Sequence, residues 1–184
     1  MPLQRNLAAI ATASLLAIAG VSGVAGAASH RAPHKKANPA AHFVVSNAKK
    51  HMAVVTMIAA EGNANGGENF DGFSKGAMTV TVPKGWTVVV HFSVSASSGI
   101  PHSLLVTPAN GKFSFTNPKP VFPGAETTNP IDGGAPGSKQ TFHFKVTKPG
   151  KYRIVCAIPG HAALGMWDWL VVSPKAHVAT ATAR

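Results

Sequence analysis

Three side chains near the carboxyl end of the chain have the types and spacing of a metal-binding loop. Cys156 is the single cysteine among 184 residues, and His161 and Met166 follow it in the stretch VCAIPGHAALGMWDW. Thiolate, imidazole and thioether groups are ligands for soft and borderline transition metals. A lone cysteine cannot form a disulfide within its own chain. The other interpretations are a buried apolar side chain, an intermolecular bridge or a nucleophile.

The elements that would position this loop are short β-strands. Apolar and β-branched runs separated by Gly, Pro and Asn clusters occur at 51–59, 77–82, 86–94, 102–107, 140–147, 151–156 and 168–173. Seven short strands of this kind predict an all-β fold, either a Greek-key β-sandwich or a barrel. The stretch 108–138 has six prolines and five glycines and no strand pattern. We expect it to wrap over one side of the domain or to form a short helix.

Alternation of side chains along each strand predicts which histidines point toward the core. The apolar alternate positions place His91 and His143 on the outer faces of their strands. The same alternation leaves His102 and Cys156 pointing inward, each at the end of a strand. A second imidazole from a distant strand can therefore meet the loop that carries the cysteine.

His102, Cys156, His161 and Met166 together have the composition of a mononuclear blue-copper site. In such a site the thiolate and two imidazoles form a trigonal plane, and a thioether binds weakly along the axis. Soft sulfur stabilises Cu(I), whereas imidazole suits both oxidation states. The residue types therefore predict one copper ion that alternates between Cu(I) and Cu(II).

The segment YRIVCAIPGHAALGMW resembles the ligand loop of the cupredoxins that have Cys-x4-His-x4-Met spacing. The upstream Asn-Phe-x-Gly at 69–72, Val-Pro-x-Gly-Trp at 82–86 and Pro-His at 101–102 resemble the sulfocyanins most, with rusticyanins next. This resemblance covers roughly 50–174. It implies a Greek-key β-sandwich with the four ligands named above, and a carrier of single electrons between redox proteins of an extracytoplasmic respiratory chain. Ser103 follows the first histidine, where many family members have an asparagine that braces the ligand loop.

The sequence also predicts how the chain is organised. Residues 1–27 have a positive Arg5, a long uncharged stretch and a small-residue cleavage site, which together indicate an export signal. We expect a flexible basic linker at 28–41, a cupredoxin domain at 42–174 and a flexible tail at 175–184. The mature protein would then lie in the periplasm or elsewhere outside the cytoplasm, and would be membrane-anchored if the signal stays uncleaved.

The charge balance favours an acidic protein partner. The expected domain has eleven Lys and Arg against six Asp and Glu, without a dense basic cluster interleaved with aromatic residues. This pattern does not indicate nucleic-acid binding. It favours a redox partner with an acidic docking surface, such as a cytochrome or a terminal oxidase, and it permits association with an anionic membrane surface. We expect the protein to be a monomer.

Other functional classes explain the pattern less well. A copper enzyme would need a second copper site with His-x-His or His-Cys-His motifs, and the chain has neither. A thiol enzyme would leave Met166 unexplained. We therefore expect no enzymatic activity. The main alternative is a copper-binding or copper-delivery protein without a redox role. The histidines at 30 and 34 are too sparse for the His-rich tract that such carriers tend to have.

Overall fold

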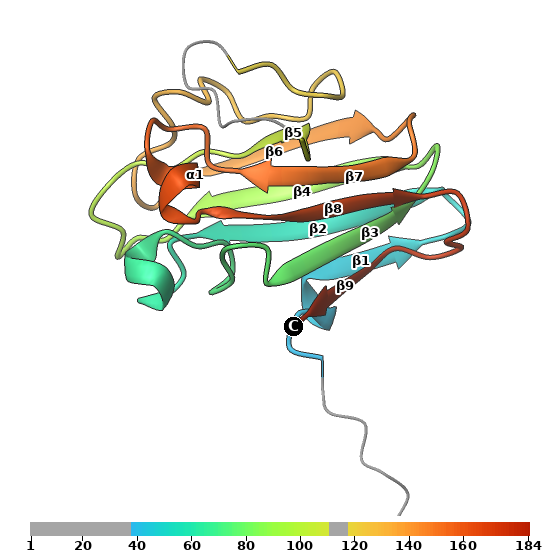
Figure 1. Cartoon of the computed structure of the whole chain (residues 1–184), viewed down its shortest axis with the longest axis horizontal. Coiled ribbons are helices and arrows are strands. Elements are labelled where there is room, and N and C mark those ends of the chain that lie inside the picture. Colours follow the sequence, from blue (N-terminus) through green and yellow to red (C-terminus); the bar gives the residue numbers. More distant parts are fainter. Residues whose placement is uncertain (1–37, 111–117) are drawn as a thin grey trace, which may run out of the picture. The chain divides into compact units, whose positions relative to one another are not determined.

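The computed structural model describes residues 38–110 and 118–184 (Figure 1). The expected export signal and most of the expected linker lie outside the described residues. The strands are β1 (Val44–Asn47), β2 (Met52–Ala59), β3 (Met78–Pro83), β4 (Thr87–Val94), β5 (Leu105–Pro108), β6 (Lys139–Lys145), β7 (Gly150–Val155), β8 (Trp167–Ser173) and β9 (Thr180–Ala183). The described helices are single turns: η1 (Ala41–Phe43), η2 (Ala64–Gly67) and α1 (His161–Leu164).

The strands form two sheets, which confirms the predicted all-β Greek-key sandwich. One sheet has the order β1-β2-β4-β6 and the other the order β5-β7-β8-β3-β9. The chain passes from β2 to β3 in the opposite sheet and returns to β4, so β2 and β4 pair in parallel. In the second sheet β3 and β8 also pair in parallel, while β7 is antiparallel to both β5 and β8.

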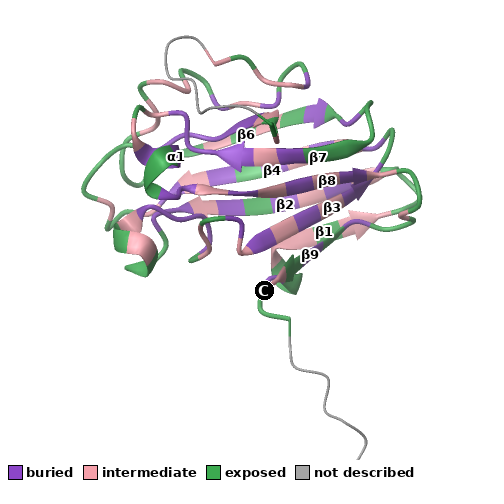
Figure 2. Ribbon diagram, viewed as in Figure 1, coloured by how far each residue is buried: buried purple, intermediate pink, exposed green. Residues whose placement is uncertain are grey.

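The core lies between the inner faces of the two sheets, as the alternating burial along the strands shows (Figure 2). On β4, alternate residues from Val88 to Val94 are buried, whereas His91 is exposed. His143 on β6 is exposed as well. The predicted orientation of these strands is therefore confirmed, and neither histidine faces the interior.

The structure differs from the expected flexible tail at 175–184. Thr180–Ala183 form β9, which pairs with β3 at the edge of the five-stranded sheet and buries Ala181. Residues 38–41 also belong to the fold rather than to a flexible linker, since Ala40 is fully buried and Asn38 donates a hydrogen bond to the carbonyl of Ala181. Both segments are short and rich in alanine, so their apolar pattern is weak in the sequence.

The described part of the 108–138 loop wraps along the segment that follows His102 and contains no helix. Gly134 exchanges two main-chain hydrogen bonds with His102, at 2.8 and 3.0 Å. Thr127 likewise bonds to both the N–H and the carbonyl of Leu104. The strand predicted at 102–107 starts later, since β5 begins at Leu105. The hydrogen bonds of Gly134 and Thr127 hold the preceding residues in place of regular strand pairing. Residues 111–117 lie outside the described residues.

Two aspartates are buried, Asp71 in the loop between β2 and β3 and Asp168 on β8. Asp71 accepts a hydrogen bond from the Ile58 N–H, and Asp168 accepts one from the Met78 N–H. The second carboxyl oxygen of each is buried without a hydrogen-bond partner. Burial raises the pKa of Asp71 to about 8, with a smaller contribution from the nearby Asp168 and against the lowering effect of the Ile58 hydrogen bond; burial also raises the pKa of Asp168 to about 7. Both groups are therefore more stable in the fold as neutral acids.

This burial predicts that folding stability falls as the pH rises. The folded state keeps the Asp71 proton up to about pH 8, whereas the unfolded chain releases it near its ordinary pKa of 3.8. The stabilisation is complete below pH 3.8 and is lost as the pH approaches 8. The free energy of unfolding of the wild type should therefore decrease as the pH rises through this range. In Asp71→Asn this decrease should be smaller by about 2–5 kcal/mol, as measured by chemical denaturation. The exposed Asp132→Asn is the control, and an unaltered slope in Asp71→Asn would contradict the prediction.

Candidate metal centre

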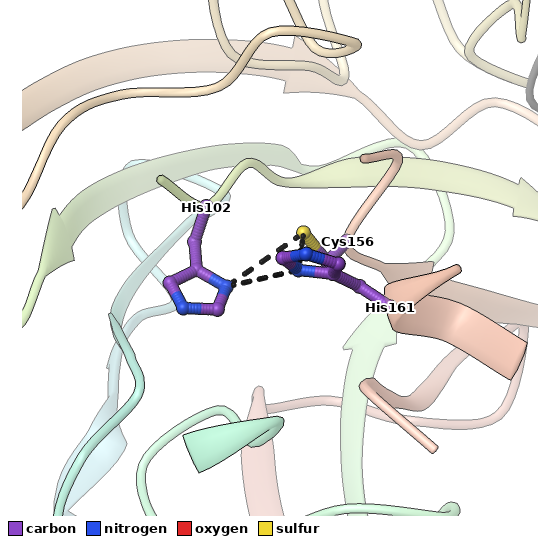
Figure 3. Close-up of side chains that lie close together, drawn as sticks. All are labelled: His102, Cys156 and His161. Atoms are coloured by element: carbon purple, nitrogen blue, oxygen red, sulfur yellow. Dashed lines mark hydrogen bonds between the residues drawn. The ribbon is translucent and has the colours of Figure 1, made fainter. Parts of the chain in front are cut away.

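Three of the four predicted ligands meet at one end of the sandwich. The ligating atoms of His102, Cys156 and His161 lie within 4.8 Å of one another, and all three residues are buried. Figure 3 shows the two imidazole rings and the sulfur converging on one point. The Cys156 Sγ lies 3.5 Å from the Nδ1 of His161 and 4.0 Å from the Nδ1 of His102, and the two Nδ1 atoms are 3.3 Å apart.

Each of these side chains is placed by main-chain pairing. Cys156 directly follows β7, and its N–H donates a hydrogen bond to the carbonyl of Met166. His161 is the first residue of α1, the single turn that connects β7 to β8. This turn ends at Gly165, whose φ of 115° is the left-handed conformation that favours glycine. A Cβ at this position would also collide with the side chain of Lys75.

The turn α1 is held against the outer face of the second sheet. Ala162 packs on Leu105, Val155 and Ala157 in a small buried cluster that Trp167 covers in part. Leu105 therefore has a core of its own on the face opposite to the main one, which explains why Leu104 and Leu105 are both buried. The packing of Ala162 fixes the direction in which the adjacent His161 points.

Met166, the fourth predicted ligand, is completely buried. Its N–H donates a hydrogen bond to the carbonyl of His161, at 3.0 Å, and its carbonyl accepts the Cys156 N–H, at 3.1 Å. The main chain of Met166 thus joins both ends of the ligand loop. Its role as the weak axial ligand remains a prediction.

The electrostatics of the site suit a bound cation. Burial, with a smaller contribution from the neighbouring His161, lowers the pKa of His102 to about 4. Burial also lowers the pKa of His161. Both rings are therefore neutral at pH 7, with nitrogen lone pairs available for a metal. Burial raises the pKa of the Cys156 thiol, although hydrogen bonds from Ser103 partly offset this effect. A metal ion would compensate the buried thiolate, so the donor set fits copper.

Ser103, directly after the first predicted histidine ligand, braces the ligand loop. Its Oγ accepts a hydrogen bond from the Ala157 N–H, at 3.0 Å, and lies 3.6 Å from the Cys156 Sγ. Its own N–H donates to the same sulfur, at 3.4 Å. A serine directly after the histidine therefore supplies both a clamp across the loop and a donor to the sulfur.

Glu68 also reaches the site, and the sequence analysis missed it. Its side chain is 11 % exposed, and one carboxylate oxygen, Oε2, lies 3.2 Å from the Nδ1 of His161. Burial raises the pKa of this carboxyl group. Glu68 precedes the Asn-Phe-x-Gly sequence, so that motif was the signal that could have drawn attention to it.

The bracing role of Ser103 predicts a stability cost when its hydroxyl is removed. Ser103→Ala would leave the buried Ala157 N–H without its acceptor, a loss of about 1–3 kcal/mol. Chemical denaturation of the metal-free protein measures this change. Ser97→Ala, at an exposed serine, should change stability by less than about 0.5 kcal/mol. Equal effects of the two substitutions would show that the hydroxyl does not clamp the loop.

Comparison with known proteins identifies the family of this chain. The family model described as the sulfocyanin (SoxE) domain matches residues 39–182. A sulfocyanin of Sulfolobus acidocaldarius is 32% identical over 135 residues, which cover 70% of this chain and 66% of that protein. Rusticyanin of Acidithiobacillus ferrooxidans is 35% identical over 106 residues, which cover 56% of this chain and 66% of that protein. The chain thus spans just under two thirds of the length of these relatives.

Other similarities are more distant. A copper-containing nitrite reductase of Neisseria meningitidis is 37% identical over 109 residues, but these cover 25% of the enzyme. The solved auracyanin structure from Roseiflexus castenholzii has a TM-score of 0.49 and 23% identity, and the alignment covers 66% of this chain and 97% of that one. The family match, by contrast, extends from the segment before η1 into β9. This chain belongs to the sulfocyanin family of cupredoxins, a family of electron carriers rather than enzymes.

Proposed function

We propose that the protein binds one copper ion through His102, Cys156 and His161, with Met166 as the weak axial ligand, and carries single electrons between redox proteins outside the cytoplasm. The observation that carries this proposal is the buried convergence of two Nδ1 atoms on one sulfur. Bound copper would supply a centre that cycles between Cu(II) and Cu(I). Family membership supports the same role.

The chain's own residues favour fast electron transfer by holding the donors rigidly. The sulfur receives hydrogen bonds from Ser103, and His102 is fixed through its other ring nitrogen, Nε2, by Ser98 at 3.1 Å. Cys156 and Met166 are completely buried, and His102 is almost so. Donors that are held by hydrogen bonds and are largely buried change little in geometry between the two oxidation states.

The buried site argues against a copper-delivery function. A protein that hands copper to a partner needs donors that the partner can approach, and such carriers tend to use exposed Met-rich or His-rich tracts. Here His161 is the most exposed of the three residues, at 8 %. Retention of the ion through both oxidation states fits this degree of burial better than rapid exchange.

Electrons would leave through the His161 ring, which has the shortest covalent path to the surface. Apolar side chains flank the two histidines: Leu164, in the turn that begins with His161, is 61 % exposed, and Ile100, two residues before His102, is 46 % exposed. Ala163 and Pro101 are exposed beside them. An exposed apolar patch is typical of a binding surface. The excess of basic residues would steer an acidic partner, such as a cytochrome or an oxidase, toward this surface.

The copper assignment predicts an intense visible thiolate-to-Cu(II) band when Cu(II) is added to the purified protein. Cys156→Ser should abolish this band, because it removes the only thiolate of the chain. Absorption spectroscopy of the two proteins measures the effect. His91→Ala, which removes an exposed imidazole from β4, should leave the band unchanged. A band that persists in Cys156→Ser would refute the ligand assignment.

The docking surface predicts that a negative charge next to His161 slows transfer to an acidic partner. Ala163→Asp should lower the bimolecular rate with an acidic cytochrome by about 3–10-fold, and rising salt should lower the wild-type rate. Stopped-flow absorbance measures both rates. The control is Val178→Asp, an exposed apolar position in the loop that follows the far end of β8. Equal rates for Ala163→Asp and this control would place docking elsewhere.

A further inference from the structure

A buried carboxyl group lies against the proposed ligands, and its nearest polar neighbour is the His161 imidazole. The Oε2 of Glu68 is 3.2 Å from the Nδ1 of His161, yet it is buried and accepts no hydrogen bond. This Nδ1 is the same atom that faces the Cys156 sulfur and the His102 ring. The carboxylate oxygen therefore approaches an atom that is itself expected to bind the metal.

Four atoms that can each give a lone pair to a metal ion lie close together here. They are two imidazole nitrogens, a sulfur and a carboxyl oxygen, and three of their separations lie between 3.2 and 3.5 Å. The four residues are at most 8 % exposed, so charges among them are weakly screened. A buried charge is tolerated when it is paired or when it faces a metal. Within the described residues, the ion pair that Glu68 makes is with His161 and not with a lysine or arginine.

The loop that carries Glu68 is built around the side chain of Asn69. This amide is completely buried and makes three hydrogen bonds. Its Oδ1 accepts the N–H groups of Glu61 and Gly72, at 3.1 and 2.9 Å, and its Nδ2 donates to the carbonyl of Ala64, at 2.8 Å. Asn69 therefore closes the loop on both sides of Glu68, which fixes the main chain from which the carboxylate extends.

Asn65 connects the same loop to the ligand turn. Its Nδ2 donates to the carbonyl of Glu68, at 2.8 Å, and to the carbonyl of Leu164 in α1, at 3.2 Å. Asn65 has a φ of 50°, a left-handed conformation that asparagine tolerates better than most residues. One side chain thus sets the spacing between the segment that holds Glu68 and the turn that holds His161.

We propose that Glu68 is a further residue of the metal centre and that its carboxylate faces the bound ion and favours Cu(II) over Cu(I). The Asn69-Phe70-Asp71-Gly72 motif, which directly follows Glu68, positions this side chain. This inference rests on the copper site proposed above. A carboxylate oxygen is a hard donor and carries a full negative charge, so it stabilises a divalent ion more than a monovalent one. It opposes the effect of the soft Met166 thioether. The balance between the two would tune the reduction potential.

The test compares Glu68→Gln with Glu61→Gln, which removes an exposed charge from the same loop. Competition with chelators of known affinity gives the Cu(II) and Cu(I) affinities of each protein. We expect the ratio of Cu(II) to Cu(I) affinity to fall roughly tenfold or more in Glu68→Gln and to change little in the control. Zn(II) affinity of the metal-free proteins should fall in the same variant, because that ion also benefits from an anionic oxygen.

Asn65→Gly provides a second variant in which the charge is retained. Glycine accepts the left-handed conformation but cannot bond to Leu164, so the carboxylate is less firmly held. We expect a smaller fall of the affinity ratio in the same direction. Equal affinity ratios and equal Zn(II) affinities in Glu68→Gln and Glu61→Gln would overturn the inference. A wild-type protein that lacks the Cys156-dependent visible band would instead overturn the copper site itself, so the two failures are distinguishable.

Discussion

The packing of lone-pair atoms in a buried site is the constraint on which the rest of the structure depends. His102, Cys156 and His161 can be held together only if segments more than fifty residues apart are fixed at the same end of the sandwich. Pairing of β5 with β7 brings the first histidine to the cysteine, and the turn α1 returns the second histidine over the same edge. Main-chain hydrogen bonds hold both histidines in these positions, from Gly134 to His102 and from Met166 to His161.

Much of this arrangement follows from local sequence patterns. Alternation along β4 and β6 correctly separated the exposed His91 and His143 from the interior, because one face of each strand packs on the core. Cys156 follows the end of a strand and His161 begins a single turn five residues later, so the two side chains lie close together. His102 was harder to place, since Leu104 and Leu105 are both buried and strict alternation fails there.

The features that the sequence did not predict depend on contacts between distant segments. The strand β9 consists of alternating threonine and alanine, and only its pairing with β3 shows that Ala181 is core. The clamp by Ser103 becomes visible once Ala157 is placed beside it. Glu68 resembles any acidic loop residue in the sequence. Its burial results from the hydrogen bonds of a neighbouring asparagine and from the fold that positions both loops.

The side chain of Asn38 has a consequence for the connectivity of the fold. It donates to the carbonyl of Ala181 and accepts the N–H of Ala183, so the first described residue and the last strand are joined directly. β9 forms the edge of its sheet opposite to β5, away from the strands that flank Cys156. The two ends of the domain could therefore be linked covalently and the chain reopened at another turn. Such a circular permutant would keep the same sheets and leave the metal-binding end intact.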